Sequence, residues 1–249
     1  MTKGVHFLDA EGPAGMRIFA VGDIHGRVDL LEAMHDRITD DLRSSPPDEW
    51  RIVYLGDYGD RGPDTSGVIS HLIALKERDP RVITLRGNHD QAFLDFLGVG
   101  DRIRLFERYG GFQTAASYGV TADFTSPEAA SATKEALVAA MPAEHLRFLA
   151  KLPLSAAFGD FFFCHAGIRP GVPLAEQDPN DLIWIRETFL NDPRLHPKVV
   201  VHGHTPVEEP EFMANRVDVD TGAYYSGLLT ALVIEGKEKK VLTVSGPAG

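Results

Sequence analysis

Short apolar, β-branched runs alternate along the chain with longer segments of helical periodicity. This alternation is typical of an α/β fold, in which sheets pack against helices. The pattern predicts eight strands: Arg17–Val21, Arg51–Leu55, Arg81–Leu85, Phe161–Cys164, Lys198–Val201, Arg216–Val219, Leu228–Ile234 and Lys240–Val244. We expect the last three to be antiparallel, because tight glycine turns separate them.

Amphipathic helices are predicted directly after the first two strands, at Asp29–Leu42 and Asp64–Arg78. Apolar residues recur there at the spacing that places them on one helical face. They are Leu30, Leu31, Met34 and Ile38 in the first helix, and Val68, Leu72 and Leu75 in the second. The stretch 91–152 is helical in pattern throughout. We expect residues 1–249 to form a single domain, with about 91–152 as a helical insertion.

Each of the first five apolar runs ends in a short turn that carries side chains able to bind a metal or transfer a proton. The turns are Gly22-Asp23-Ile24-His25-Gly26, Gly56-Asp57-Tyr58-Gly59-Asp60-Arg61-Gly62, Gly87-Asn88-His89-Asp90, His165-Ala166-Gly167 and His202-Gly203-His204-Thr205. The ligand crevice of an open α/β sheet lies outside the carboxyl ends of the strands. We therefore expect the five turns to converge, which a metal site requires.

The turns supply six candidate metal ligands, namely Asp23, His25, Asp57, Asn88, His165 and His204. Six donors exceed what one tetrahedral ion needs, whereas two ions about 3.5–4 Å apart and bridged by one carboxylate use them all. Mixed carboxylate and imidazole ligands favour manganese, iron, zinc or nickel. The prediction is two divalent ions, with Mn²⁺ as first choice and Fe, Zn or Ni as alternatives.

Composition restricts the chemistry further. The single cysteine, Cys164, excludes an internal disulfide or a thiolate cluster, so oxygen and imidazole must hold any metal. A net charge of −11 argues against nucleic acid as a partner. Two divalent ions nevertheless outweigh Asp23, Asp57 and a bridging hydroxide, which leaves the site positive and suited to a phosphate.

The chain's apolar runs also bear on its location. They are all far shorter than the roughly 20 residues of a membrane-spanning helix. The start of the sequence lacks the features of a secretory signal. We therefore expect a soluble, cytoplasmic protein with no membrane partner. The sequence does not indicate an oligomeric state.

The five turns, in this order and spacing, resemble the phosphoprotein phosphatase branch of the calcineurin-like metallophosphoesterase superfamily, in its bacterial and phage form. The family pattern is GDxHG, GDxVDRG, GNH with a following acid, H-[AG]-G and GHT. One departure is Gly59, which stands where the family usually has valine. The resemblance implies a metallophosphatase β-sandwich of two mixed sheets flanked by helices. It also implies direct attack of a metal-bridging hydroxide on a phosphate ester.

Carried over residue by residue, the resemblance implies a role for each side chain. Asp23 and His25 would hold the first metal, Asp57 would bridge, and Asn88, His165 and His204 would hold the second. His89 would be the general acid, with Asp60 orienting it. Arg61 and Arg186 would bind phosphate oxygens, because a guanidinium makes bidentate contacts.

Residues outside the motif positions have structural roles as alternative interpretations. Arg186 would instead form a surface ion pair with Glu187 or Asp181. His202 is interpreted as a packing histidine, and Cys164 as a small buried residue. Asp220 either supports a nearby turn or ligand, or is solvated. The histidines without a motif are expected to face solvent: His6, His35, His71, His145 and His196.

Three functions compete. The first is a serine/threonine protein phosphatase acting on phosphoserine or phosphothreonine, or on a small phosphoester. The second is a nucleotide hydrolase similar to the symmetrical diadenosine tetraphosphatases, for which Arg102, Arg104 and Arg108 would bind a polyphosphate. The third is a binding module that has lost the chemistry, but no predicted ligand is missing here.

Overall fold

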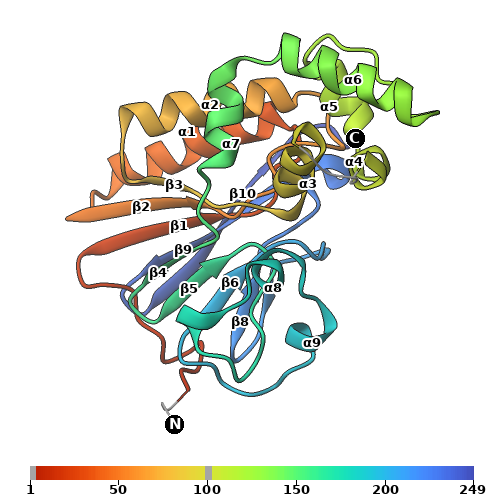
Figure 1. The fold of residues 1–249 in the computed structure, drawn as a ribbon. Coiled ribbons are helices and arrows are strands. Elements are labelled where there is room, and N and C mark those ends of the chain that lie inside the picture. The colour runs from red at the N-terminus through yellow and green to blue at the C-terminus, as the bar shows by residue number, and fades with distance from the viewer. Residues whose placement is uncertain (1–3, 99–102) are drawn as a thin grey trace.

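The computed structural model describes residues 4–98 and 103–249, which form two five-stranded mixed sheets flanked by helices (Figure 1). The first sheet has the order β10-β9-β1-β2-β3 and the second β4-β5-β6-β8-β7. The strands are β1 Met16–Val21, β2 Glu49–Tyr54, β3 Val82–Thr84, β4 Ser155–Phe158, β5 Phe161–Cys164, β6 Val199–His202, β7 Glu211–Phe212, β8 Arg216–Asp218, β9 Leu228–Glu235 and β10 Glu238–Ser245. The predicted α/β class with two mixed sheets is confirmed.

The helices follow the strands as the periodicity predicts. They are α1 Val28–Ser44, α2 Thr65–Arg78, α3 Asn88–Leu97, α4 Ile103–Tyr109, α5 Gly111–Ser117, α6 Pro127–Ala140, α7 Ala143–Ala150, α8 Pro179–Trp184, α9 Glu187–Leu190 and α10 Ala223–Ser226, with a 3-10 turn at Leu174–Glu176. The predicted apolar faces of α1 and α2 are buried. Asp64 caps α2 by accepting a hydrogen bond from the Gly67 amide.

Alternation along the strands builds three apolar layers. In β1, Ile18 and Ala20 face the second sheet, whereas Phe19 and Val21 face α1 and α2. Successive side chains of a strand point to opposite faces of its sheet. Because both sets of side chains are buried here, each sheet is covered on both faces. Cys164 lies in a third apolar cluster, between the second sheet and helices α8 and α9. Figure 1 shows this order of helices, sheet, sheet and helices.

Three strand expectations needed correction. Two strands, β4 and β7, were missed: β4 contains two alanines and a serine, and β7 has only two residues. The stretch Arg216–Val219 is not antiparallel to its successors, because β8 lies in the second sheet and pairs parallel with β6. The turn after β8, with Gly222 at φ 66°, carries the chain across to the first sheet instead of closing a hairpin. Only β9 and β10 form the expected antiparallel pair.

Between β3 and β4, the regular elements within the described part of the chain are the helices α3 to α7. Phe93, Phe96 and Phe106 stack between α3 and α4, with ring centroids 4.5–5.0 Å apart. Arg102 lies outside the described residues, and the side chain of Arg104 is not described. In the ranges 4–98 and 103–249, the helices are too short or too polar to cross a membrane.

Candidate metal centre

The five motif turns meet at one edge of the two sheets. Strands β1, β2 and β3 run parallel in the first sheet, as β5 and β6 do in the second. Their carboxyl ends therefore open on the same side. The six predicted ligands are at most 4% exposed: Asp23, His25, Asp57, Asn88, His165 and His204. Buried charged and imidazole groups at one point call for a shared partner.

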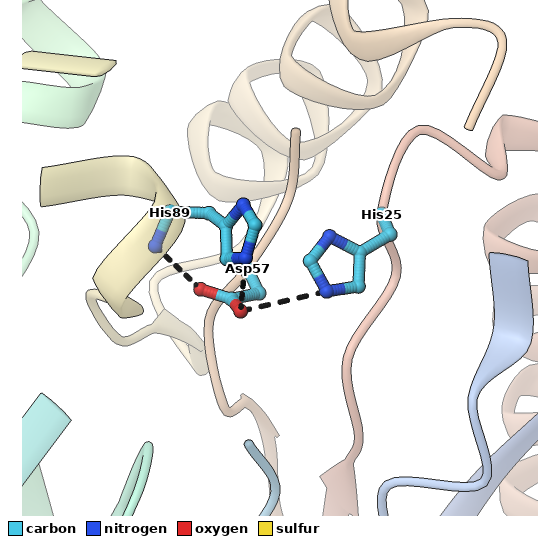
Figure 2. A group of neighbouring side chains, drawn as sticks. All are labelled: His25, Asp57 and His89. Carbon is cyan, nitrogen blue, oxygen red and sulfur yellow. Dashed lines mark hydrogen bonds and ion pairs between the residues drawn. The ribbon is translucent and has the colours of Figure 1, made fainter. Parts of the chain in front are cut away.

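Asp57 is at the centre of this edge (Figure 2). Its Oδ2 atom lies 3.5 Å from Nε2 of His25, 3.4 Å from Nε2 of His165 and 3.9 Å from Nε2 of His89. These separations exceed hydrogen-bond distances, yet all three nitrogens point at one oxygen. The other oxygen, Oδ1, accepts a hydrogen bond from the His89 amide at 2.9 Å. A carboxylate so surrounded suits the bridging position between two cations.

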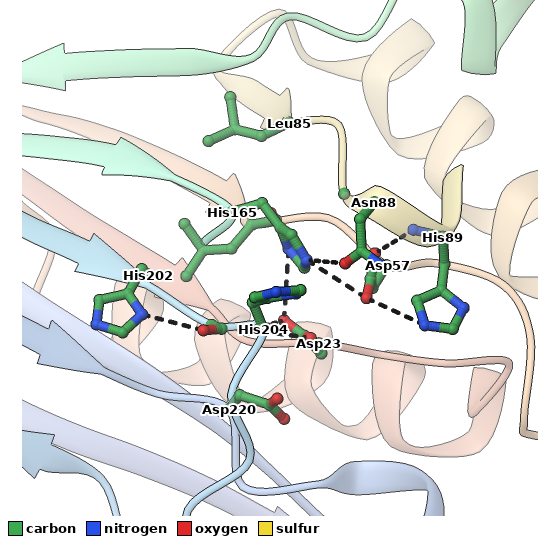
Figure 3. Close-up of polar contacts among 12 residues, drawn as sticks. Asp23, Asp57, Leu85, Asn88, His89, His165, His202, His204 and Asp220 are labelled. Carbon is green, nitrogen blue, oxygen red and sulfur yellow. Dashed lines mark hydrogen bonds and ion pairs between the residues drawn. The ribbon is translucent and has the colours of Figure 1, made fainter. Parts of the chain in front are cut away.

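The donor atoms fall into two groups that share Asp57. One group contains His25, Asp57 and His89, and the other Asp57, His165 and His204, with all atoms of a group within 4.8 Å of one another. Asn88 joins the second group, because its Oδ1 lies 2.9 Å from Nε2 of His165 (Figure 3). The buried Nε2 of His204 has no hydrogen-bond partner. A buried imidazole with an unpartnered nitrogen in this cluster fits a metal ligand.

The structure places Asp23 beside His165 and His204. Its carboxylate accepts the His204 amide at 3.2 Å and lies 3.8 Å from Nδ1 of His165. Asp23 belongs to neither donor group, and its pairing with His25 on one metal stays a prediction.

Backbone carbonyls fix the orientation of two ligand rings. Nδ1 of His25 lies 2.8 Å from the Gly59 carbonyl, and Nδ1 of His165 lies 3.2 Å from the Leu55 carbonyl. A proton on each Nδ1 is donated to the carbonyl, which leaves the lone pair on each Nε2 available to a metal. This arrangement is typical of metal-ligating histidines.

Burial and neighbouring charges shift the pKa values of the candidate ligands. Burial, with Asp220 and Asp57 nearby, holds the pKa of Asp23 well above its usual value. Burial lowers the pKa of His204 to about 2, so its imidazole is neutral and able to bind a metal. Burial opposes ionisation of Asp57, but His165 and His89 outweigh it and hold the pKa of Asp57 well below its usual value.

The backbone of these turns is strained. Among the residues that the structure describes, the non-glycine residues with positive φ are His25, Asp57, Asp60, Arg61 and His204, at 45–70°. Side chains with a Cβ disfavour this left-handed region. All five belong to the motif turns, where such strain aims a side chain away from the strand direction.

His89 forms the start of a hydrogen-bonded chain into the protein. Its Nδ1 lies 2.8 Å from Oδ2 of Asp60, whose Oδ1 accepts a 2.6 Å hydrogen bond from the Thr114 hydroxyl. Burial disfavours the charged imidazole, but the carboxylates of Asp57 and Asp60 outweigh it and raise the pKa of His89. The structure thus brings Asp60 to the position that the sequence prediction requires.

Both predicted arginines also reach the centre. Nη2 of Arg61 lies 3.0 Å from Nε2 of His89, and its guanidinium lies over the ring of Tyr224, 4.8 Å from the centroid. Arg186 donates to the Thr205 hydroxyl at 2.9 Å, in the turn that carries His204. The alternative partner Asp181 is paired with Arg169 instead, at 2.6 Å.

Two residues at the centre had no assigned role in the sequence. Asp90 accepts hydrogen bonds from the amides of Gly87, Asp57 and Tyr58 at 2.8–3.1 Å, and so joins two motif turns. Its position as the acid after Asn88-His89 was the available signal. Thr114 arrives from α5 in the helical segment, and no local pattern marks it.

The remaining candidates are mostly structural. His202 is buried, with Nδ1 3.0 Å from the Gly203 carbonyl, and belongs to neither donor group. Asp220 accepts the Gly222 amide at 2.9 Å and supports that turn. The expectation that all motif-free histidines face solvent was wrong for His145 and His196, which are 2% and 4% exposed.

Two stacked mixed sheets with buried carboxylate, amide and imidazole donors at their shared edge define a metallophosphoesterase. The model of the calcineurin-like phosphoesterase family matches residues 16–228, and the chain belongs to that family. It is 27% identical over 250 residues to a bis(5'-nucleosyl)-tetraphosphatase PrpE [asymmetrical] of Anoxybacillus flavithermus, covering 92% of this chain and 93% of the relative. The Bacillus thuringiensis protein of the same name is 24% identical, covering 94% and 95%.

Solved structures share the fold. A candidate diadenosine tetraphosphatase has a TM-score of 0.63 at 20% identity and covers 96% of this chain and 100% of its own. A serine/threonine phosphatase from Saccharomyces cerevisiae has a TM-score of 0.58 at 15% identity, covering 98% of this chain and 86% of its own. At these identities the likeness concerns the fold alone.

Proposed function

We propose that this chain hydrolyses phosphate esters at a centre of two divalent metal ions, and that nucleoside polyphosphates are its substrates. The observation that carries the hydrolytic part is the convergence of three imidazole nitrogens on Oδ2 of Asp57. Imidazole nitrogens gathered around one buried carboxylate oxygen are suited to hold metal ions, and the buried Nε2 of His204 beside them has no hydrogen-bond partner.

The residues present fit two metals. Asp57 would bridge, Asp23 and His25 would hold one ion, and Asn88, His165 and His204 would hold the other. The orphaned Nε2 of His204 and the neutral state of its ring support this assignment. When bound, divalent metals supply a nucleophile at neutral pH and Lewis-acid activation of the phosphoryl group. We take manganese as the first ion to test.

The protein's own side chains bind the phosphoryl group and supply a proton. Arg61 comes from the turn after β2, and Arg186 lies between α8 and α9. Both bind oxygens of the phosphoryl group, because charge redistributes onto these oxygens during transfer. His89 protonates the leaving oxygen from Nε2, while Asp60 holds Nδ1. Nη2 of Arg61 contacts Nε2 of His89 in this structure. The guanidinium must therefore move from this nitrogen to the phosphate before Nε2 can carry the proton.

Two substrate classes compete for this centre. The nucleotide class is supported by relatives that match nearly the whole chain and carry the name bis(5'-nucleosyl)-tetraphosphatase. Phosphoserine or phosphothreonine in proteins is the second candidate, because the five motifs resemble the phosphoprotein phosphatase branch. Either substrate would use the same metals, the same arginines and the same proton donor.

A metal-reconstitution assay tests the hydrolytic proposal. Purified protein is stripped with a chelator, and hydrolysis of diadenosine tetraphosphate is followed as Mn²⁺ is added. We expect activity to be lost on stripping and restored at about two ions per chain. Reconstituted protein that binds manganese but hydrolyses neither this nucleotide nor a phosphopeptide would instead support a binding module.

A further inference from the structure

A hollow of about 450 Å³ opens beside the metal centre, between helices α4 and α5 and the short helix α10. Its lining includes Arg61, Arg108, Tyr109, Phe112, Gln113 and Tyr224. The volume lies within the range of small-molecule sites. Of these lining residues, the proposed hydrolysis uses Arg61, which lies next to His89.

The hollow is continuous with the reaction centre. Arg61, which lines it, contacts Nε2 of His89 at 3.0 Å, and the ring of Tyr109 lies 5.2 Å from the ring of His89. A group bonded to the reacting phosphorus on the side of His89 can therefore extend along these residues.

The walls of the hollow are aromatic. The Phe112 ring is 48% exposed and is held by edge contact with Phe124, at 4.9 Å and 79°. Tyr224 forms part of the opposite wall beneath the Arg61 guanidinium. An exposed ring that its neighbours hold in place is suited to stack on another planar ring. Aromatic side chains stack on any of the bases, because every base has a π-face.

The hollow also contains a second guanidinium. Arg108 forms no ion pair with any residue in the described ranges, whereas Arg61 serves the reacting phosphate. A phosphate monoester gives Arg108 nothing to bind, but a second phosphate farther along a chain does. Gln113 and Glu107, which also line the hollow, can hydrogen-bond to a ribose or a base edge.

We infer that this hollow is a nucleotide subsite, in which Arg108 binds a phosphate beyond the reacting one and Phe112 stacks on the base. The inference rests on the proposed function and assigns its substrate selectivity to α4 and α5. A phosphotyrosine ring would use the aromatic wall but leave Arg108 without a partner. A phosphoserine peptide would use neither feature.

The test compares two variants on three substrates in Mn²⁺. Diadenosine tetraphosphate has both base and phosphate chain, inorganic tetraphosphate has the phosphate chain alone, and glycerol 2-phosphate has neither. Phe112→Ala is expected to lower kcat/KM for the dinucleotide about tenfold relative to inorganic tetraphosphate. Arg108→Ala is expected to lower kcat/KM for both polyphosphates about tenfold relative to glycerol 2-phosphate.

Matched controls lie on other surfaces. Phe212→Ala removes a ring that is 44% exposed on the edge strand β7, and Arg147→Ala removes an exposed arginine of α7. Both are expected to leave all three rate ratios unchanged. If wild-type protein hydrolyses the dinucleotide and the two test variants keep its ratios, the subsite is wrong and the proposed function stands. If wild-type protein hydrolyses glycerol 2-phosphate but no nucleotide, both the subsite and the nucleotide class are overturned.

Discussion

The Nδ1 atom of His89 lies 2.8 Å from Oδ2 of Asp60, and both side chains are buried. The two residues come from different turns, after β3 and β2, so the contact forms only when the sheet is assembled. It holds one edge of the imidazole and leaves Nε2 directed toward Asp57 and Arg61. A proton donor needs such an orientation.

His89→Asn is predicted to lower turnover about 10²–10⁴-fold, because a positioned general acid contributes about that much. Steady-state kinetics give the rate, and elemental analysis of the same sample gives the metal content. We expect the metal content to stay at the wild-type level. An unchanged rate would refute the proton-donor role, and loss of metal would make His89 a ligand of the His25 group.

Thr114→Val removes the 2.6 Å hydrogen bond to Oδ1 of Asp60. We predict that kcat falls about ten- to a hundredfold with little change in KM, because one hydrogen bond to a charged group contributes roughly 1.5–3 kcal/mol. Thr114→Ser keeps the hydroxyl and should restore most of the rate. A rate for Thr114→Ser as low as that of Thr114→Val would show that the hydroxyl alone does not restore activity, which contradicts the role given to the hydrogen bond.

Much of the metal centre could be predicted from the sequence because its ligands are local. Each one follows a buried strand within a few residues, and glycines mark the turns. The partners that arrive from distant segments could not be predicted in this way. Thr114 reaches Asp60 from α5, and Tyr224 reaches Arg61 from α10. Only the assembled fold creates these contacts.

In the fold too, the sequence predicts local elements but not the connections between distant segments. Strands β1, β2, β5 and β9 each contain a run of apolar residues, and the sequence predicts them with small errors at their ends. The sheet to which a strand belongs depends on where its connection leads. The segment 216–219 appears hairpin-like in sequence, yet its glycine turn crosses between sheets.

Gly203→Ala is predicted to weaken metal binding. A Cβ at this position would lie 2.2 Å from Oδ1 of Asp23, so the carboxylate must move away from His204. Displacing a group that contacts a ligand typically costs 10–100-fold in metal affinity. Competition with a metallochromic chelator measures this affinity.

Gly236→Ala serves as the control for Gly203→Ala. Its backbone has φ 55°, and no atom lies within 4 Å of the added Cβ. It should lower thermal stability without changing metal affinity. Equal affinity losses in the two variants would show that Gly203→Ala acts through general destabilisation.

Asp57→Asn and His204→Ala should differ in metal stoichiometry. Asp57 belongs to both donor groups, whereas His204 belongs to one. We predict that Asp57→Asn weakens both ions, while His204→Ala keeps about one ion per chain. Titration calorimetry with Mn²⁺ distinguishes the two patterns. A variant of Asp57 that still binds two ions at wild-type affinity would exclude a bridging role.

His145 should make stability depend on pH. It accepts or donates hydrogen bonds to Tyr118 at 2.9 Å and Ser70 at 3.1 Å, and burial lowers its pKa. The folded pKa lies below the unfolded value of about 6.5, so the unfolded chain takes up the proton first. The stability contribution is present above pH 6.5 and is lost as the pH falls below it.

Urea unfolding of wild type and His145→Gln from pH 7.5 to pH 5 measures this effect. Removing the imidazole should flatten the decline in the free energy of unfolding below pH 6.5. Parallel curves for the two proteins would show that His145 keeps its ordinary pKa in the folded state.

The most direct test of the central claim is the parallel hydrolysis of diadenosine tetraphosphate and a phosphothreonine peptide by the Mn²⁺-loaded protein. We predict that kcat/KM for the nucleotide exceeds that for the peptide by a hundredfold or more, and that a chelator abolishes both activities. A hundredfold preference for the peptide would contradict the nucleotide assignment and make this chain a protein phosphatase with the same metal centre.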